Sequence, residues 1–234
     1  MVNIDIHRST LIGILRAIYS DPYLRNSLGF KGGTAALLFY NLPRFSVDLD
    51  FDLLDSSKKE EVFERLKSIL PPFGTILEAQ DKKHTLFFLL SYTKGERSVK
   101  VEISKRVIKS AFEVKNLLGI SMLVMKQDDM IAGKLAALLT RKKFASRDMY
   151  DLWFFLKEQW NINEEYLLEK SEYSLKDSLT RAQTLVENVK QSELLAGLGE
   201  LLDSKQKSWV KEHLKSDLLF YLRLHESNIL SKDK

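Results

Sequence analysis

The first half of the chain mixes helical and strand-like patterns of hydrophobic residues. Apolar residues recur at helical spacing over residues 7–19 and 57–70, which predicts two amphipathic helices. An Asp-Pro pair at 21–22 ends the first helix and starts a short second one, and a Pro-Pro pair at 71–72 ends the other. A short apolar helix is expected over residues 34–40, after a glycine turn.

Strand-like alternation follows this short helix. Residues 46–54 alternate acidic with apolar side chains, so Asp48, Asp50 and Asp52 share one face of the predicted strand. Residues 84–93 and 98–104 predict two more strands, because the Lys-Gly-Glu-Arg segment between them is typical of a hairpin. Glu102 should therefore lie on a strand antiparallel to its neighbour. An extended segment within residues 112–125 is a further, less regular candidate.

Only helical periodicity remains in the second half, where no proline occurs after residue 72. The expected helices span residues 127–141, 146–157, 163–171, 174–190, 192–202 and 206–229. The pattern predicts an α+β fold in which a mixed β-sheet flanked by helices is followed by an α-helical C-terminal region. We place the domains at 1–126 and 127–234.

Composition narrows the class of protein. The 234 residues are 44% hydrophobic, which is enough for a substantial core, and they include no cysteine, which excludes disulfides and thiolate metal sites. No apolar run approaches the ~20 residues of a membrane span, and MVNIDIHRST lacks the apolar core of a signal peptide. We expect a soluble, cytoplasmic protein without membrane partners.

The positive charge is concentrated in one segment. Residues 104–143 contain nine Lys or Arg and three acids, a net +6, so the remainder of this +4 chain carries −2. Such a segment is typical of a surface that binds phosphates, although a solvated face of lysines would have the same composition.

Two carboxylates at positions i and i+2 of one strand lie about 6–7 Å apart on the same face. With a third acid from a neighbouring strand, this arrangement can hold a pair of Mg²⁺ ions for attack at phosphorus. Asp48, Asp50 and Glu102 fit that design, although alternating acids also form the solvated face of ordinary edge strands.

A glycine turn before a helix is the second candidate element. Gly32, Gly33 and Thr34 would present backbone N–H groups at a positive helix end, which suits a triphosphate. Gly-Gly also occurs in ordinary turns. The succession of a glycine turn, a helix and an Asp-x-Asp motif is therefore stronger evidence than either motif alone. A nucleotide is the expected ligand.

The segment KGGTAALLFYNLPRFSVDLDFDL resembles the signature of the AbiEii/AbiGii toxin family of nucleotidyltransferase-like proteins. A second motif also resembles the family: Gly133-Lys134 to Arg141, followed by Arg147-Asp148-Met-Tyr-Asp151-Leu-Trp. The similarity is dense over residues 30–54 and 126–157 and extends over the remainder only as a pattern of elements.

The resemblance implies a DNA polymerase β-type nucleotidyltransferase that transfers a nucleoside monophosphate from an NTP, with Mg²⁺ or Mn²⁺. The family's metal ligands fall on Asp48 and Asp50, with Glu102 as the third carboxylate where Asp is more common. Gly32, Gly33, Thr34, Arg44, Ser46 and Lys134 would bind the nucleotide. The resemblance further implies the toxin of a bacterial type IV or abortive-infection toxin–antitoxin system, with an antitoxin partner and tRNA as acceptor.

Other residues in the motifs have two interpretations each. Lys134 contacts the triphosphate or is an exposed lysine, and Arg44 contacts phosphate or caps its loop. Asp151 orients Lys134, acts as the general base, or pairs with Arg147. Gly133 would let its helix approach the sheet closely, which would offset its cost of roughly 1 kcal/mol relative to Ala.

Arg141, Lys142 and Lys143 are the candidate RNA-binding residues, and the C-terminal helix either braces the bundle or carries RNA. The four histidines, His7, His84, His213 and His225, have no metal-ligand spacing and are expected to be structural. Two alternatives remain open: transfer of the nucleotide to a protein or small molecule, and a module that binds NTP or a partner without turnover.

Overall fold

A computed structural model describes residues 4–93, 97–106 and 110–232, and the chain divides into two compact units. Within these ranges the first unit comprises residues 4–93, 97–106 and 111–125. The second comprises Ser110 and residues 126–232. Each unit is described separately.

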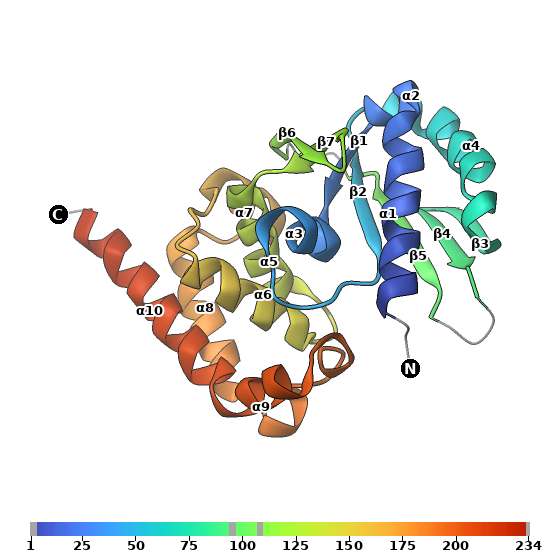
Figure 1. Cartoon of the computed structure of the whole chain (residues 1–234). Coiled ribbons are helices and arrows are strands. Elements are labelled where there is room, and N and C mark those ends of the chain that lie inside the picture. Colours follow the sequence, from blue (N-terminus) through green and yellow to red (C-terminus); the bar gives the residue numbers. More distant parts are fainter. Residues whose placement is uncertain (1–3, 94–96, 107–109, 233–234) are drawn as a thin grey trace. The chain divides into compact units, whose positions relative to one another are not determined.

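The first unit is built on one seven-stranded sheet with the order β3-β4-β5-β2-β1-β7-β6 (Figure 1). Its strands are β1 (Leu28–Lys31), β2 (Leu49–Leu53), β3 (Thr75–Lys82), β4 (Thr85–Ser91), β5 (Val99–Ser104), β6 (Phe112–Leu117) and β7 (Ile120–Met125). The β2–β5 and β1–β7 pairs are parallel and the other pairs are antiparallel. This mixed sheet confirms the predicted fold class, including the antiparallel neighbour of the strand that carries Glu102.

One face of the sheet is apolar and covered by helices. The helices of this unit are α1 (Ile4–Ser20), α2 (Pro22–Arg25), α3 (Gly32–Tyr40) and α4 (Lys59–Ile69). Tyr19 of α1 packs on Phe51 of β2, and Phe63 of α4 packs on Phe88 of β4. The Tyr19 hydroxyl is within hydrogen-bond distance of the carbonyls of Leu28 and Leu123, and burial raises its pKa.

The second face of the sheet is less covered at β4 and β5. Alternate residues of these two strands are fully buried, while those between them, including Glu102, are only half-buried. The alternation shows that the helices of this unit cover one face of these two strands more completely than the other.

The second unit is helical. It contains α5 (Gln127–Thr140), α6 (Ser146–Lys157), α7 (Glu164–Ser171), α8 (Leu175–Asn188), α9 (Ser204–Glu212) and α10 (Leu214–Lys232). Helix α5 packs on α6 and α7, and α10 packs on α6 and α8. Trp153 of α6 and Trp209 of α9 lie against each other, with ring centroids 4.2 Å apart.

Several boundaries differ from the sequence-based prediction. Residues 192–202 form 3-10 turns rather than an α-helix, because Gly197, at φ +67°, interrupts the helical backbone. The helix expected over residues 206–229 is two helices that meet at His213. Strands β1 and β3 were not predicted, and β2 begins at Leu49 rather than residue 46.

In the described ranges, none of the helices has the length and hydropathy that a membrane span requires.

Candidate functional site

Asp50 lies at the centre of a row of charged side chains on the polar face of the sheet. In the register it is opposite Lys31 of β1 and beside Glu102 of β5. Register partners on adjacent strands lie about 4.8 Å apart and project from the same face. The structure therefore brings Asp50 and Glu102 to one face, as the alternation predicted, and Asp48 directly precedes the same strand.

Asp48, Asp50 and Asp52 form an acidic stripe along the chain, and its outer two members differ in their environment. Asp52 is buried and forms an ion pair with Lys31. Asp48 is 3.8 Å from the Lys100 ammonium through Oδ2, and its side chain is 18% exposed. Its other oxygen, Oδ1, is buried and has no hydrogen-bond partner among the described residues. A buried carboxylate oxygen without a partner is costly, which makes Asp48 Oδ1 a candidate ligand for a cation.

Other side chains approach Gly32 and Gly33 so closely that neither position has room for a Cβ atom. A Cβ atom added at Gly32, whose φ is +79°, would lie 2.4 Å from Asp50 Oδ2. One added at Gly33 would lie 2.6 Å from Arg44 Nη2 and 2.9 Å from Ser46 Oγ. The glycine turn therefore lies directly against three of the predicted site residues.

Thr34 connects the glycine turn to residues 45–48, which precede β2 and are called the aspartate loop below. Its hydroxyl is within hydrogen-bond distance of Ser46 Oγ, 2.9 Å away, and of the carbonyl of Asp48. Arg44 is buried and donates from Nη1 to the carbonyl of Phe45 at 2.9 Å, so it fastens its own loop. The side chain of Lys31, the N-cap residue of α3, makes no capping hydrogen bond, so the start of this helix is a candidate anion-binding site.

The oxygen donors of this face suit a hard divalent cation. Mg²⁺ is usually held by one or two carboxylates together with substrate phosphates, rather than by a cage of protein ligands. In the part of the chain that the structure describes, no three His, Asp or Glu side chains converge into a metal-binding group. Asp48 and Asp50 therefore fit the role of a carboxylate pair, while Glu102 as a third ligand stays a prediction.

A second cluster of charges lies within the helical unit. The Lys134 ammonium of α5 is 3.0 Å from Asp148 Oδ1 and 2.7 Å from Asp151 Oδ2, both on α6. Both carboxylates are almost completely buried, and Arg141 Nε lies 3.0 Å from Asp148 Oδ2. Asp151 thus holds the Lys134 ammonium, as one of the sequence-based interpretations predicted.

The predicted RNA-binding residues are not equivalent. Arg141 directly follows α5 and pairs with Asp148, whereas Lys142 and Lys143 are exposed in the turn after it. Lys31, Lys100 and Asp148 are not among the site residues predicted from the sequence. For Asp148 the signal was present, because it shares a helix face with Asp151.

Within the helical unit Gly133 has room for a side chain, and its approach to the sheet stays a prediction. A Cβ atom there would have the Tyr166 ring as its nearest neighbour, at an ordinary 3.6 Å. Gly133→Ala should therefore stabilise the helical unit by about 0.5–1 kcal/mol in urea unfolding. Gly32→Ala, the matched substitution at a crowded position, should destabilise the sheet unit. A urea midpoint for Gly133→Ala below that of the wild type would contradict the inference that Gly133 has room for a side chain.

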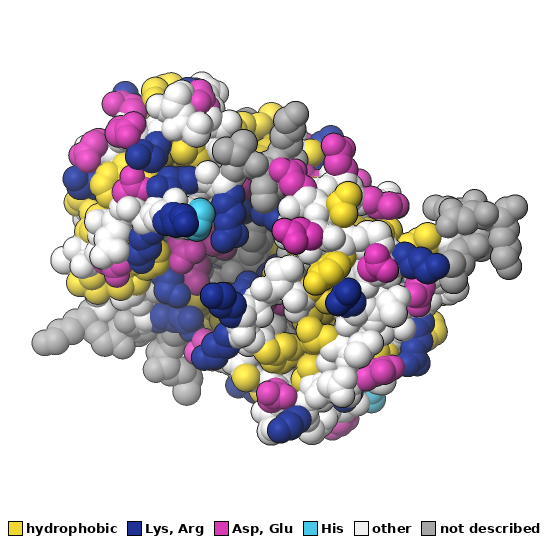
Figure 2. Space-filling model, turned by 180° about the vertical axis from the view of Figure 1, so that it is seen from behind, with side chains coloured by type: hydrophobic (Ala, Val, Ile, Leu, Met, Phe, Trp, Pro, Cys, Tyr) yellow, Lys and Arg dark blue, Asp and Glu magenta, His cyan; other side chains and the backbone are white. Residues whose placement is uncertain are grey.

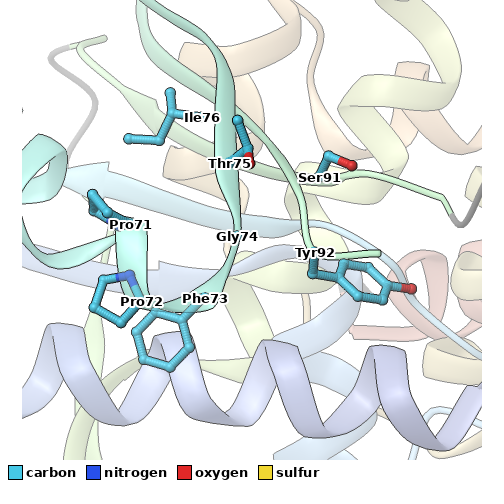
Figure 3. A pocket seen from close by; sticks show the side chains of 8 residues that line it. All are labelled: Pro71, Pro72, Phe73, Gly74, Thr75, Ile76, Ser91 and Tyr92. Atoms are coloured by element: carbon cyan, nitrogen blue, oxygen red, sulfur yellow. The ribbon is translucent and has the colours of Figure 1, made fainter. Parts of the chain in front are cut away.

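The surface of the sheet unit has two further features. In the left half of Figure 2, which shows the β3, β4 and β5 side of Figure 1 from behind, Lys and Arg side chains gather around acidic ones. An open pocket of about 650 Å³ lies elsewhere in this unit, lined by Pro71–Ile76, Ser91 and Tyr92 (Figure 3). None of the predicted site residues lines this pocket.

A family model and two solved structures are similar to this chain. A family model described as the nucleotidyl transferase AbiEii toxin of a type IV toxin–antitoxin system matches residues 13–212. The crystal structure of JHP933 from Helicobacter pylori has 23% identity and a TM-score of 0.62, covering 100% of this chain and 97% of that chain. A candidate nucleotidyltransferase from the same organism has 24% identity and a TM-score of 0.62, covering 97% of this chain and 96% of its own. None of the curated proteins compared with the sequence is a significant match. The chain belongs to the AbiEii family of nucleotidyl transferase toxins of type IV toxin–antitoxin systems, and it is a nucleotidyltransferase.

Proposed function

We propose that this nucleotidyltransferase uses Mg²⁺ to transfer a nucleoside monophosphate from an NTP to an RNA acceptor, with tRNA as the acceptor class. The observation that carries the proposal is the assembly of Gly32, Gly33, Thr34, Ser46, Asp48 and Asp50 around one helix end. Mn²⁺ is the expected substitute for Mg²⁺. The family further suggests a cognate antitoxin and action in the cytoplasm.

Different residues would bind the metal ion and the phosphates in this reaction. Bound Mg²⁺ would neutralise phosphate charge and promote ionisation of the acceptor hydroxyl. Asp48 and Asp50, with Glu102 as the third carboxylate, would hold the metal, and the start of α3 with Arg44 and Ser46 would bind the phosphates. The acceptor hydroxyl loses its proton to water and its oxygen attacks the α-phosphorus. The bond from that phosphorus to the bridging oxygen breaks, and pyrophosphate leaves with that oxygen.

Lys134 is the proposed cation for the departing pyrophosphate. Because Asp151 is buried and only 2.7 Å from its ammonium, we assign Asp151 to orienting Lys134 rather than to proton abstraction. Both predicted domains, 1–126 and 127–234, would then supply residues to the reaction.

The acceptor class follows from charge. The +6 segment of residues 104–143 favours a polyanion over a small molecule. Incubation with each labelled NTP, Mg²⁺ and total RNA, followed by electrophoresis, tests this directly. Label in RNA supports the proposal, whereas label in protein or a small molecule moves the acceptor to another class. No transfer with any acceptor would favour a binding module.

RNA binding should depend on Lys142 and Lys143. Replacing both with Ser should weaken tRNA binding and reduce the slope of log affinity against log salt by up to about 0.7–0.9 per lost contact. Both lysines are exposed, so the folded structure should not change, and NTP affinity should be unaffected.

The matched control replaces two exposed lysines outside the basic segment, Lys176 and Lys205, with Ser. Titration of labelled tRNA at several salt concentrations provides the comparison. Equal slopes for the two double variants, or an affinity independent of salt, would contradict RNA binding by this segment.

A further inference from the structure

A fully buried histidine connects the first helix to the aspartate loop. His7 of α1 has no exposed surface, and its Nε2 lies 2.9 Å from the carbonyl oxygen of Val47. Its Nδ1 lies 2.9 Å from the hydroxyl of Tyr92, at the end of β4. The His7 ring also packs edge-on against Phe45 and Tyr92.

The partners determine which nitrogen carries the proton. A carbonyl oxygen can only accept a hydrogen bond, so His7 Nε2 must donate to Val47. In the neutral ring Nδ1 then accepts from the Tyr92 hydroxyl. Tyr92 also borders the open pocket, where its ring lies next to α1 (Figure 3).

The segment that His7 holds has no strand partner. Residues 45–48 precede β2 and take no place in the ladder, and side chains contact the carbonyl groups of Phe45, Val47 and Asp48 instead. Thr34 contacts the carbonyl of Asp48, and His7 donates to the carbonyl of Val47 next to it. These two contacts hold the two consecutive peptide groups that flank the Asp48 α-carbon.

We propose that His7 is a positioning residue that fixes the Asp48 carboxylate for cation binding by holding the Val47 carbonyl. The inference rests on the proposed function to the extent that Asp48 binds the metal ion. It assigns a task to a histidine that lies 41 positions earlier in the sequence and outside every motif of the chain.

Two substitutions of His7 separate positioning from packing. Gln at this position can place its amide N–H where Nε2 was, whereas Asn is one methylene shorter and cannot reach Val47. Mutation of a residue that orients a metal ligand without touching the metal typically costs 10–100-fold in metal affinity or activity. His7→Asn should therefore weaken Mn²⁺ binding about tenfold or more and lower kcat more than it raises KM for NTP, whereas His7→Gln should stay within about threefold.

Binding is measured by electron paramagnetic resonance of free Mn²⁺, with a non-hydrolysable NTP present, and kcat and KM by transfer of labelled nucleotide to total RNA. His84→Asn is the matched control, because His84 is exposed between β3 and β4. Equal Mn²⁺ affinities of His7→Asn, His7→Gln and wild type, with a weaker Asp48→Asn variant, would overturn the role of His7. Unchanged affinity of Asp48→Asn would instead overturn the proposed metal site.

A measurement on the wild type does not depend on the folding of any variant. The His7 Nε2–H proton should be visible by NMR as a hydrogen-bonded signal, because the site is fully buried. Its chemical shift should change when Mg²⁺ and the non-hydrolysable NTP are added together. Absence of this change, while signals from Asp48 do shift, would also contradict the proposal.

Discussion

Replacing Asp48 or Asp50 with Asn should lower nucleotidyl transfer by at least about 10³-fold while leaving the fold intact. The substitution removes the charge that holds a divalent cation but hardly changes the volume of the side chain. A metal pair stabilises both the attacking and the leaving oxygen, and the loss of even one such donor elsewhere costs about 10²–10³-fold. Growth arrest, if the chain causes it on expression, should be relieved in parallel.

Asp52→Asn is the control for this experiment, because Asp52 belongs to the same stripe but forms an ion pair with Lys31. Its effect on transfer should be much smaller, and its main consequence should be lower stability. Circular dichroism and urea unfolding establish that all three variants are folded. Full activity of an Asp48→Asn, Asp50→Asn double variant would exclude these carboxylates as metal ligands.

Lys134→Met should lower both activity and stability. A lysine that neutralises the leaving pyrophosphate acts mainly in the transition state, so kcat should fall by on the order of 10²-fold or more. The same change leaves Asp148 and Asp151 buried with one cation fewer. Removing one partner of a buried ion pair typically costs 3–5 kcal/mol.

A second substitution separates these two effects. Combining Lys134→Met with Asp151→Asn removes one charge of each sign, so unfolding stability should largely return while transfer stays low. Lys142→Met is the surface control and should change neither quantity much. If activity returned together with stability in the double variant, the ion pair would serve only to hold the helices together.

The sequence predicted those elements whose pattern is strong and local. The alternation around Asp50 placed three acids on one face, and the helical spacing around Lys134 and Asp151 placed them on packed helices. The glycine turn followed from residue type alone, and the structure supplies its physical reason, which is the carboxylate of Asp50 against Gly32.

The missed features depend on partners far away in the sequence. Strand β1 has four residues and includes Gly29, so it carries too little periodicity to be recognised. Strand β3 lies at the edge of the sheet and is largely solvated, so its residues are mostly polar or charged. The ion pair of Asp52 with Lys31 and the contact of His7 with Val47 join residues 21 and 40 positions apart, which no local pattern encodes.

The central claim is that this chain transfers the α-phosphoryl group of an NTP, with its nucleoside, through the carboxylates of the sheet. It is tested most directly by incubating the wild type and Asp50→Asn with total RNA, Mg²⁺ and NTPs labelled separately at the α- and γ-phosphate. We predict that the α-label enters RNA with the wild type only, while the γ-label leaves as pyrophosphate. Entry of the γ-label into RNA, or α-label transfer that persists in Asp50→Asn, would contradict the account.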